Sequence, residues 1–454
     1  MIRKTKKEPK RHQKEKVAER IVKKLVDNGF KAFWVGGCVR NLLLNLPPED
    51  IDIATDAKPE EIIKIFKKTV KVGMEFGVVI VFLNGIKTEV ATFRSDGEYI
   101  DHRHPKQIHF STPRDDANRR DFTINGLFYD PIKKEILDFV KGKEDLKTGI
   151  IRAIGNPLER IEEDALRIMR AVRFAVRFNF KIEPKTFKAI QENAEFLRNI
   201  SADRIRIELL KMLQGPRPGD AIKILEESGI LLVILPEVSA MKGVSQPPEF
   251  HPEGDVFEHT YLALNLLEKQ TPTLTMATLL HDVGKPQTFK VSDRIRFDLH
   301  NRVGSDMARS ICVRLNFPHK QLRWIVSLVE RHMDFLNIQN MRKSKLKRFL
   351  SSETIYEDIE LHRVDCLASH GDTFNVDFCY KKIKEFESEE SLNPTPLING
   401  DSLIKVGYKP GPIFSSILTK VRDAQLEGII KSEDEALSFV LKNFPLNNSN
   451  VSKE

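Results

Sequence analysis

Hydrophobic and polar positions follow two different patterns along this chain. In the first third, short apolar runs separated by turn residues are typical of strands. The strand candidates are residues 31–35, 51–54, 70–83 and 87–93, with further short elements at 121–129 and 135–139. Asn84-Gly85 predicts a tight hairpin turn between two of these runs. From residue 155 almost to the end, apolar positions recur at helical spacing, so we expect a mixed α/β region followed by helices.

Short helices are predicted around these strands. One follows a basic segment, residues 1–16, that we expect to be disordered, and its apolar face is formed by Val17, Ile21, Leu25 and Val26. Another helix begins at Pro59, because the first helical turn tolerates proline. Residues 94–118 are polar and irregular, which predicts a long loop with a function of its own.

Length and composition restrict the class of protein. A chain of 454 residues predicts two to four domains. Hydrophobic residues make up 41%, and the longest apolar runs, such as Val78–Leu83, are too short to cross a bilayer. No signal peptide is recognised, so we expect a cytoplasmic protein without a membrane partner. The four cysteines form no Cys-x-x-Cys pair, which favours reduced, structural thiols over a disulfide scaffold.

The positive charge is concentrated at the N-terminus. The formal net charge is +8. The basic residues of the first segment are Arg3, Lys4, Lys6, Lys7, Lys10, Arg11, Lys14 and Lys16. Such a segment suits a polyanion, because phosphates release counterions when they are contacted. A solvated tail without a partner fits the composition equally well, so charge alone leaves both interpretations open.

Two carboxylates follow the Gly36-Gly37 turn. Asp50 and Asp52 alternate on a predicted strand, so both side chains should point to the same face. Neighbouring carboxylates repel each other unless a cation lies between them, which makes this pair a candidate Mg²⁺ site. Two such ions can activate a 3′-hydroxyl and stabilise a leaving pyrophosphate in an in-line displacement. Glu89, on a later strand, is a candidate third carboxylate.

The Gly-Gly turn and several polar residues are candidates for holding a nucleotide. Gly36-Gly37 leaves the backbone bare beside a helix N-terminus, where N–H groups can hold triphosphate oxygens, and Arg40 follows on the first turn. Arg119-Arg120-Asp121, with Asn125, offers guanidinium forks for phosphate and hydrogen bonds for a sugar. An ordinary tight turn and a structural ion-pair cluster are the alternatives.

A further charged group falls in the predicted helical region. Arg160, Glu163, Asp164 and Arg167 are spaced by three and four residues, which would place them on one face of a helix, and Arg170 continues the basic series. A carboxylate beside a guanidinium can imitate the edge of a partner base. Asp164 can accept from the exocyclic amine of C or A, while Arg167 can donate to the C carbonyl or to a ring nitrogen. A salt bridge on a solvated helix is the alternative.

Histidine and aspartate gather in the second half. His281-Asp282 ends an apolar run, and both side chains are costly to bury unless they bind a metal or each other. Histidine and carboxylate ligands together suit Mg²⁺, Mn²⁺, Ni²⁺ or similar ions. The other candidates in this half are His259, His300, His332 and Asp365.

In its first half the chain resembles the bacterial CCA-adding enzyme and poly(A) polymerase family. The motifs that carry this resemblance are Gly36–Asn41, Asp50–Asp52, Glu89–Arg94, Arg119–Asn125 and Glu163–Arg167, which cover most of residues 30–180 in the family's order. The resemblance implies a polymerase-β-like nucleotidyltransferase head with catalytic metal on the two aspartates. It also implies contacts of Arg119–Asn125 with ribose and triphosphate, and an amino-acid template that includes Asp164 and Arg167.

The histidine-rich half resembles an HD domain, a helical, metal-dependent phosphohydrolase module. His259, His281, Asp282 and Asp365 match its metal pattern, and His300 and His332 match additional histidines of fuller versions. Some CCA-adding enzymes carry such a domain, with phosphatase or 2′,3′-cyclic phosphodiesterase activity. The resemblance therefore implies a second divalent metal, Mg²⁺, Mn²⁺ or Ni²⁺. The alternative is an intact but purely structural domain that grips RNA.

The resemblance implies a template-independent tRNA nucleotidyltransferase that adds or repairs the 3′-terminal CCA from CTP and ATP and contacts the 3′ end and acceptor arm of tRNA. A poly(A) polymerase, an enzyme that adds only CC or only A, and an RNA-binding protein with an inactive head are the alternatives. The stretch Val72–Val79 looks more like the CCA-adding type than the polymerase type. The sequence leaves the oligomeric state open.

The expected fold class is an α/β head followed by an all-α neck, an HD-type helical body and a tail. The expected segments are a basic disordered tail at 1–20, the head at 21–150, the neck with the nucleotide-selecting motif at 151–215, the HD domain at 216–390 and a helical, RNA-contacting tail at 391–454.

Overall fold

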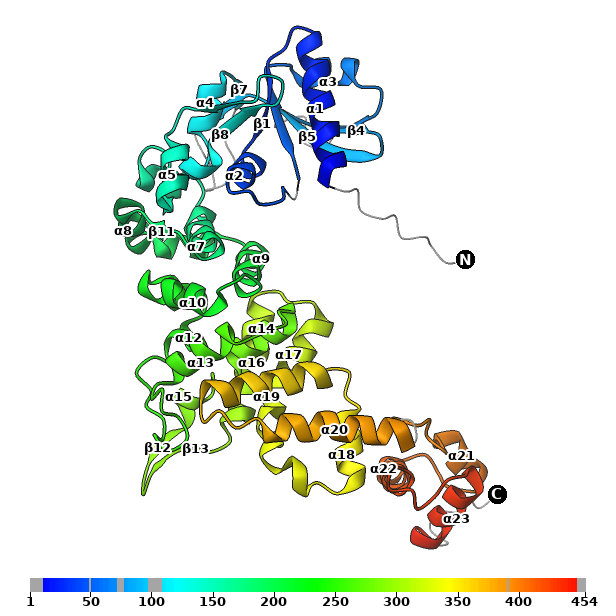
Figure 1. Cartoon of the computed structure of the whole chain (residues 1–454). Coiled ribbons are helices and arrows are strands. Elements are labelled where there is room, and N and C mark those ends of the chain that lie inside the picture. The colour runs from blue at the N-terminus through cyan, green and yellow to red at the C-terminus, as the bar shows by residue number, and fades with distance from the viewer. Residues whose placement is uncertain (1–10, 49, 72–76, 97–107, 390–391, 447–454) are drawn as a thin grey trace. The chain divides into compact units, whose positions relative to one another are not determined.

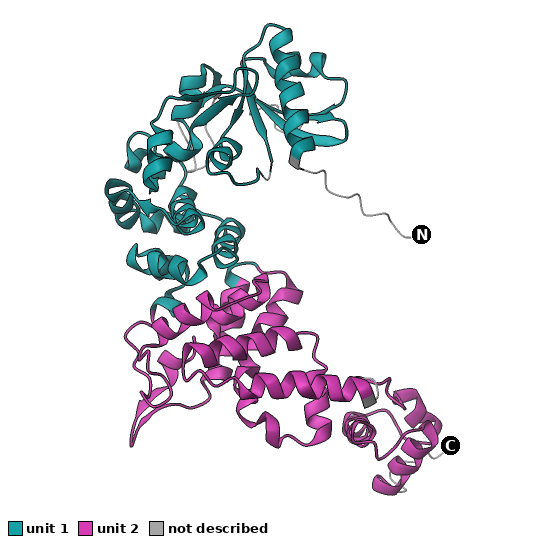
Figure 2. Cartoon of the chain, viewed as in Figure 1, with its two compact units in different colours: residues 1–239, 314–316 teal, residues 240–313, 317–454 magenta. Residues whose placement is uncertain are grey.

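The computed structural model describes residues 11–48, 50–71, 77–96, 108–389 and 392–446 (Figure 1). The described residues do not include most of the basic tail, the middle of the 94–118 loop or Val72–Phe76. The predictions made for these segments therefore stay predictions. Two compact units form, residues 1–239 with 314–316 and residues 240–313 with 317–454 (Figure 2). No described helix combines the length and the hydropathy that a membrane span requires.

The first unit begins with a seven-stranded mixed sheet in the order β3-β4-β5-β2-β1-β8-β9. Its strands are β1 (Ala32–Val35), β2 (Asp52–Thr55), β3 (Thr69–Val70), β4 (Val78–Leu83), β5 (Ile86–Thr92), β8 (Leu127–Asp130) and β9 (Glu135–Asp138). Among the described strands of this sheet only β2 and β5 pair in parallel, with Ile53 opposite Val90, and this register places Glu89, in the middle of β5, beside Asp52, the first residue of β2. Asn84 and Gly85 both have positive φ, 51° and 78°, which confirms the predicted tight turn.

Helix α1 (Arg11–Asp27) corrects two predictions at the N-terminus. Residues 11–16 are helical rather than disordered, because their Lys, Arg, Glu and Gln side chains are good helix formers next to a buried apolar face. That face is formed by Val17, Ile21, Val22 and Leu25, and it packs on β1, β2 and β5. Val26 is 42% exposed, because nine residues beyond Val17 is the opposite side of a helix.

The described ends of the 94–118 segment are ordered, which corrects the expectation of an irregular loop. Strands β6 (Arg94–Asp96) and β7 (Ile108–Phe110) pair in antiparallel fashion. Helix α4 (Pro113–Asn118) follows, with Pro113 at its start and Thr112 as its cap, since the Thr112 hydroxyl accepts from the Asp115 N–H. This helix leads directly into Arg119 and thereby fixes where that residue lies.

Helices complete the first unit. They are α2 (Gly37–Leu43), α3 (Pro59–Ile65), α5 (Gly142–Thr148), α6 (Pro157–Glu163), α7 (Leu166–Phe178), α8 (Pro184–Glu192), α9 (Ala202–Leu213), α10 (Pro218–Glu227), α11 (Ile230–Ile234) and α12 (Pro236–Ser239), with 3-10 turns η2 (Thr123–Asn125) and η3 (Ala194–Asn199). Strands β10 (Ile150–Ile151) and β11 (Lys181–Ile182) pair in parallel. Because α10 packs on α7 and α11 on η3, the first unit extends to residue 239, past the boundary expected at residue 215.

The second unit is almost entirely helical. Its elements are α13 (Val256–Asn265), α14 (Pro272–Leu280), α15 (Lys285–Thr288), β12 (Phe289–Val291), β13 (Ile295–Phe297), α16 (His300–Arg314), α17 (His319–Arg331), η4 (His332–Asn340), α18 (Lys343–Leu350), α19 (Ile355–Ala368), α20 (Phe374–Glu389), α21 (Gly400–Lys405), α22 (Ile413–Glu427) and α23 (Glu433–Asn443). One apolar core joins η4, α18, α19 and α20, and another joins α21, α22 and α23. An α/β region followed by helices is the fold class that the hydrophobic pattern predicted.

Candidate active sites

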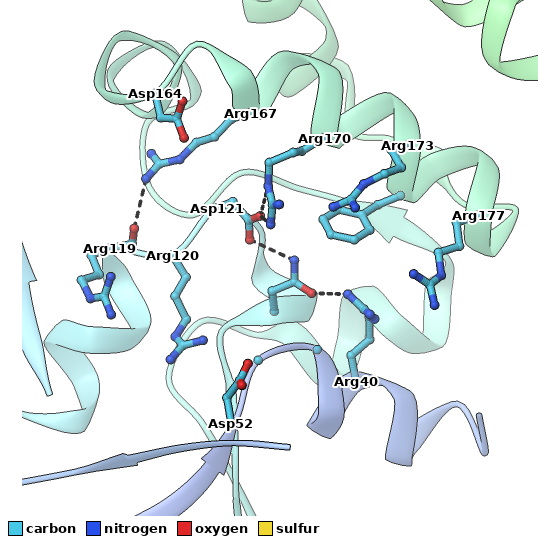
Figure 3. A pocket seen from close by; sticks show the side chains of 14 residues that line it. Arg40, Asp52, Arg119, Arg120, Asp121, Asp164, Arg167, Arg170, Arg173 and Arg177 are labelled. Atoms are coloured by element: carbon cyan, nitrogen blue, oxygen red, sulfur yellow. Dashed lines mark hydrogen bonds and ion pairs between the residues drawn. The ribbon is translucent and has the colours of Figure 1, made fainter. Parts of the chain in front are cut away.

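A polar cavity of about 450 Å³ opens in the first unit (Figure 3). Among the predicted residues, those that line it are Gly36, Gly37, Arg40, Asp52, Arg119, Asp121, Asn125, Asp164, Arg167 and Arg170. Arg120, Arg173, Phe174 and Arg177 line it as well. The sheet, the motif around η2 and helix α7 therefore meet at one cavity, although their residues are far apart in the sequence.

Of the three predicted carboxylates, Asp52 lines this cavity, while Asp50 and Glu89 are not among its lining residues. Partial desolvation raises the pKa of Asp52 to about 6 although its side chain is exposed at the cavity mouth, and repulsion from Glu89 and Asp50 adds to the rise against the opposing charge of Arg120. Asp50 is 86% exposed, and Lys14 Nζ lies 3.4 Å from its Oδ1. Glu89 is exposed and lies beside Lys87. The three carboxylates do not form a set of oxygens within 4.8 Å of one another among the described residues.

The Gly36-Gly37 turn allows close approach of the arginines. Gly36 has φ 74°, a region that favours glycine, and a Cβ there would lie 2.9 Å from Arg120 Nη1. A Cβ on Gly37 would lie 3.4 Å from Arg40 Nη2. The bare backbone therefore leaves room for guanidinium groups at the start of α2.

A chain of hydrogen bonds connects α2, η2 and α7 across the cavity (Figure 3). Arg40 Nη1 donates to Asn125 Oδ1, and Asn125 Nδ2 donates to Asp121 Oδ1 at 2.9 Å. Arg170 Nε donates to the other oxygen of Asp121 at 2.9 Å. Burial would raise the pKa of Asp121, but Arg170 and Asn125 outweigh it and lower the pKa to about 2. The carboxylate is therefore ionised throughout the neutral range and orients both neighbours.

The cavity carries a surplus of positive charge. Burial lowers the pKa of Arg40 to about 10, and the nearby guanidiniums of Arg177, Arg173 and Arg170 contribute to the decrease. Guanidiniums held this close repel one another, so an anion between them is stabilised. Planar guanidinium groups also match the geometry of phosphate oxygens. The arrangement suits a polyphosphate.

Asp116 was missed by sequence reasoning, although it positions two arginines of the cavity. Arg119 Nε donates to its Oδ1 at 2.8 Å, and Arg120 Nη2 donates to its Oδ2 at 2.9 Å. Burial opposes ionisation of Asp116, but the two guanidiniums lower its pKa below the usual value. Its side chain is only 1% exposed. The one available signal was a carboxylate three and four residues before the Arg-Arg pair on a short helix.

The predicted base-selecting group does not share one helix face, which corrects the sequence interpretation. Helix α6 ends at Glu163 and α7 begins at Leu166, with Asp164 extended between them. Asp164 Oδ1 accepts from the Leu166 N–H at 3.1 Å, so the side chain caps the second helix and favours the break. Arg204 of α9 also contacts Asp164, at 3.3 Å. Asp164 and Arg167 both reach the cavity from this junction (Figure 3).

Neighbouring groups hold Arg167 in place. Its Nη1 donates to Glu163 Oε2 at 2.7 Å and to the Arg160 carbonyl at 2.8 Å, while its Nη2 donates to the Arg119 carbonyl at 3.2 Å. Arg160 itself does not line the cavity, and it pairs with Glu163 and with the Asn118 carbonyl. A carboxylate and an anchored guanidinium therefore lie at the end of the cavity away from Asp52.

A second polar centre lies in the second unit, where His259 of α13, His281 and Asp282 after α14, and Asp365 of α19 meet. His259 Nε2 lies 3.0 Å from Asp365 Oδ1, and His281 Nε2 lies 3.3 Å from Asp282 Oδ2. Both Nε2 atoms and Asp282 Oδ2 are buried without an aligned hydrogen-bond partner among the described residues. Orphaned polar atoms that converge in this way fit a bound cation.

Each histidine of this centre is oriented by a bond at its other nitrogen. His281 Nδ1 lies 2.8 Å from the Thr278 carbonyl, which requires the proton on Nδ1 and leaves Nε2 as an acceptor. His259 Nδ1 lies 2.6 Å from Glu253 Oε1, a residue that sequence reasoning missed. Burial opposes protonation of His259, but Asp365 and Glu253 raise its pKa to about 9. The donor set suits a divalent metal.

The second centre opens onto a cavity of about 570 Å³. Lys285 Nζ lies 2.6 Å from Asp282 Oδ2 and donates to Gln246 Oε1, so a buried ammonium stands at the cavity wall. Gly284 passes so close to α16 that a Cβ would collide with the His300 carbonyl, which explains the glycine between Asp282 and Lys285. A cation site beside a lysine is an arrangement that can hold a phosphoryl group.

Comparisons with known proteins identify relatives of both units. The sequence model of the Poly A polymerase head domain matches residues 32–152, that of the probable RNA- and SrmB-binding site of polymerase A matches 179–242, and that of the HD domain matches 256–368. The CCA-adding enzyme of Ligilactobacillus salivarius is 34% identical, over 92% of this chain and 93% of its own length. That of Streptococcus agalactiae serotype V is 31% identical, over 93% and 96%.

A solved structure of the Bacillus stearothermophilus CCA-adding enzyme in complex with CTP superimposes with a TM-score of 0.73 and 25% identity, covering 96% of this chain and 98% of that one. The resemblance inferred from motifs is confirmed over nearly the whole length. This chain belongs to the CCA-adding enzyme family of nucleotidyltransferases.

Proposed function

We propose that this protein adds or repairs the 3′-terminal CCA of tRNA from CTP and ATP. The observation that carries the proposal is the composition of the first cavity. It has an acidic end at Asp52, a cluster of arginines in its middle, and a carboxylate with a guanidinium, Asp164 and Arg167, at its far end. A metal-bound triphosphate with its base at the far end matches this order of charges. The names of the relatives, and the CTP in the structure from Bacillus stearothermophilus, support the same assignment.

In this proposal Asp50 and Asp52 hold Mg²⁺, and Glu89 supplies a third carboxylate from the adjacent strand. At such a site two divalent ions activate the attacking hydroxyl and neutralise the leaving pyrophosphate. Desolvation and repulsion from Glu89 and Asp50 raise the pKa of Asp52, and this supports the role because a bound cation would relieve the repulsion. Gly36, Gly37 and Arg40 lie beside the triphosphate, and Asp121 and Asn125 orient the arginines that contact it.

In this proposal Asp164 and Arg167 select the base of the incoming nucleotide by hydrogen bonding. Asp164 accepts from an exocyclic amine, which C and A carry and U lacks, so with uracil this hydrogen bond is not made. Arg167 donates to the C carbonyl or to a ring nitrogen of A. Its anchoring to Glu163 and to two backbone carbonyls supports this role, because a fixed guanidinium selects by geometry.

The test is to sequence the products made on three tRNAs, ending before the first cytidine, after one and after two, with CTP, ATP and Mg²⁺. We expect CCA, CA and A to be added, respectively. Asp52→Asn should abolish all three additions. Asp56→Asn is the matched control, because Asp56 lies just beyond the other end of β2 and its Oδ1 accepts from the Lys31 N–H, a role that asparagine retains. A long homopolymer of A would establish a poly(A) polymerase, and addition of only CC or only A a partial enzyme.

A second proposed function is phosphohydrolysis at the HD centre. The convergence of buried ligand atoms from His259, His281 and Asp282 beside Lys285 favours it over a purely structural domain. We expect phosphate release from phosphomonoesters, or opening of 2′,3′-cyclic phosphates, dependent on Mn²⁺, Ni²⁺ or Mg²⁺. His281→Gln should abolish hydrolysis and leave nucleotide addition intact, while His319→Gln, an exposed histidine at the start of α17, should change neither. Hydrolysis that survives His281→Gln would contradict the assignment.

A further inference from the structure

A smaller cavity of about 140 Å³ adjoins the cavity of the HD centre. The larger one, here called the HD cavity, has Asp282, His300, His332 and Asp365 in its wall. The smaller one, here called the side cavity, is formed by η4, α19, the start of α20 and the turn between these two helices. Four side chains line both cavities, so no more than one layer of side chains separates them. They are Leu336, His362, Cys366 and His370. The side cavity is completed by Gln339, Asp372, Phe374 and Asn375.

The two cavities differ in charge. Lys285, Arg294 and Arg296 line the HD cavity, which suits the anionic part of a phosphoester. Among the described residues, no lysine or arginine lines the side cavity, and Asp372 adds a carboxylate to its wall. Because a carboxylate repels a phosphate group, the side cavity suits a neutral group that is attached to the phosphoester.

Helix α19 connects the side cavity to the predicted metal ligands. Asp365, one of these ligands, follows His362 by three residues on this helix. One helical turn is about 5.4 Å long, so the side cavity begins about one turn from the ligand. The His362 ring lies parallel to that of Phe335, with centroids 4.4 Å apart and 10° between the planes, which holds the ring at the border of the two cavities. A group one sugar away from the phosphoester can therefore reach the side cavity.

Two amides offer hydrogen bonds in a fixed order. Asn375 Nδ2 donates to the Phe335 carbonyl at 3.1 Å, so the oxygen of this amide is left as an acceptor. Gln339 Nε2 donates to that oxygen at 2.7 Å. Gln339 Oε1 then has no donor among the described residues and is available at the cavity wall. A carbonyl of this kind matches the exocyclic amine of a nucleobase.

Phe374 supplies an aromatic ring beside these amides. The residue is 60% exposed, and it lines the side cavity. Its N–H donates to Asp372 Oδ1 at 2.9 Å, which ties the start of α20 to the preceding turn. An exposed aromatic ring is a surface on which any base can stack. The ring and the two amides together suit a planar heterocycle.

We propose that the side cavity binds the base of a nucleoside whose phosphoester lies at the HD centre. The inference rests on the proposed phosphohydrolase function and deepens it, because it names the substrate as a phosphoester carried by a terminal nucleoside. Phe374 stacks on the base, and Gln339 Oε1 accepts from its exocyclic amine. A phosphoester without a base loses both contacts.

The test compares two cyclic phosphodiesters that differ only in the base, adenosine 2′,3′-cyclic phosphate and 1-O-methylribose 2,3-cyclic phosphate. The full-length chain hydrolyses them with Mn²⁺. In both, water attacks the phosphorus, one P–O ester bond breaks and the released ribose oxygen takes up a proton. Because base–aromatic stacking strengthens binding about tenfold, we expect kcat/KM to be about tenfold higher for the adenosine substrate. His281→Gln should abolish both reactions, which assigns them to the HD centre.

Two variants test the side cavity itself. Phe374→Ala should lower kcat/KM for the adenosine substrate about tenfold. Gln339→Ala should lower it about threefold, since one hydrogen bond is lost. Neither variant should change hydrolysis of the substrate without a base. Tyr356→Ala is the matched control, because this aromatic residue is 58% exposed near the start of α19, lines neither cavity and should leave both rates unchanged.

Equal kcat/KM for the two substrates in the parent chain would overturn the base subsite and leave the phosphohydrolase standing. No hydrolysis of either substrate would overturn the phosphohydrolase as well. A preference for adenosine that survives both Phe374→Ala and Gln339→Ala would overturn the assignment to this cavity. The comparison in the parent chain decides the question even where a variant fails to fold.

A short RNA that ends in adenosine 2′,3′-cyclic phosphate, assayed beside the mononucleotide, distinguishes an RNA end from a free nucleotide as the source of the nucleoside. Whichever is hydrolysed faster, the decrease caused by Phe374→Ala must appear with it.

Discussion

Replacing Asp116 by asparagine should weaken nucleotide addition, although Asp116 itself does not line the cavity. Asp116 lies behind the first cavity and separates the guanidiniums of Arg119 and Arg120, which donate to its two oxygens from opposite sides. An amide has nearly the shape of a carboxylate, but it offers one accepting oxygen and no charge. One guanidinium would therefore lose its partner and rotate toward solvent.

The size of the expected loss of stability follows from how deeply Asp116 is buried. The Asp116 carboxylate is 1% exposed, while the side chains of Arg119 and Arg120 are 21% and 19% exposed. Breaking a fully buried pair costs about 3–5 kcal/mol, and partial access of water to the guanidiniums places this case near the lower limit, at about 3 kcal/mol of unfolding free energy. A misplaced binding group reduces catalysis on the order of 100-fold. We expect such a decrease in kcat/KM, equal for CTP and ATP, because the triphosphate is common to both.

The assay measures initial rates of CTP and ATP incorporation into matched tRNA ends, together with thermal unfolding to separate activity from stability. Asp115→Asn is the control, since it removes the same charge from the same short helix and asparagine preserves the cap with Thr112. The double variant Asp116→Asn, Arg120→Ala tests whether Asp116 acts through Arg120. If it does, the decreases in kcat/KM of the two single variants should not add. Rates within twofold of the Asp115→Asn control at unchanged stability would refute the reasoning.

Three other measurements probe the two centres. Because the pKa of Asp52 is about 6 and only the ionised carboxylate binds metal, Mn²⁺ affinity of the first unit should fall about tenfold from pH 7 to pH 5; a pH-independent affinity would contradict the ligand assignment. Asp164→Asn should raise incorporation of UMP relative to CMP at least about tenfold, because the amide can donate to the uracil carbonyl; unchanged selectivity in a competition assay would exclude base reading by this residue. Glu253→Gln should weaken metal binding at the HD centre about 10- to 100-fold by loosening His259, as measured by calorimetric titration, and unaltered affinity would show that the contact at 2.6 Å does not orient the ring.

The sequence predicted those parts of the fold and the sites that depend on local pattern. The strands around Asp52 and Glu89, the turn at Asn84-Gly85 and the change to helices after residue 155 all followed from spacing of apolar and turn residues. Adjacent polar motifs such as Arg119-Arg120-Asp121 were recognisable because their chemistry is contained in a few residues. The parallel pairing of β2 with β5, which brings Glu89 beside Asp52, required the three-dimensional structure.

Three features escaped sequence reasoning for a common physical reason. The helix break at Asp164 depends on a side chain that satisfies the next helix's N–H, and i,i+3 spacing looks the same with or without it. Asp116 and Glu253 act by holding other side chains. The sequence does not show in which direction these two carboxylates point, so their partners could not be predicted. The apolar face of α1 was predicted, but Val26 was wrongly assigned to it. With 3.6 residues per turn, Val22 lies on the buried face and Val26 on the exposed one.

Both centres use buried carboxylates or backbone carbonyls to orient the groups that carry the chemistry. Arg119 and Arg120 depend on Asp116, Arg170 on Asp121, and the histidines of the HD centre on carbonyls or Glu253 at Nδ1. A supporting group changes the position or the affinity of another side chain, so its conservative replacement should give a graded loss. Asp52 is the proposed metal ligand, so its replacement should leave no such residual activity, because its oxygen would bind the ion directly. Graded loss at Asp116 beside complete loss at Asp52 would therefore distinguish a centre organised in two layers from one in which every charged residue contacts the substrate directly.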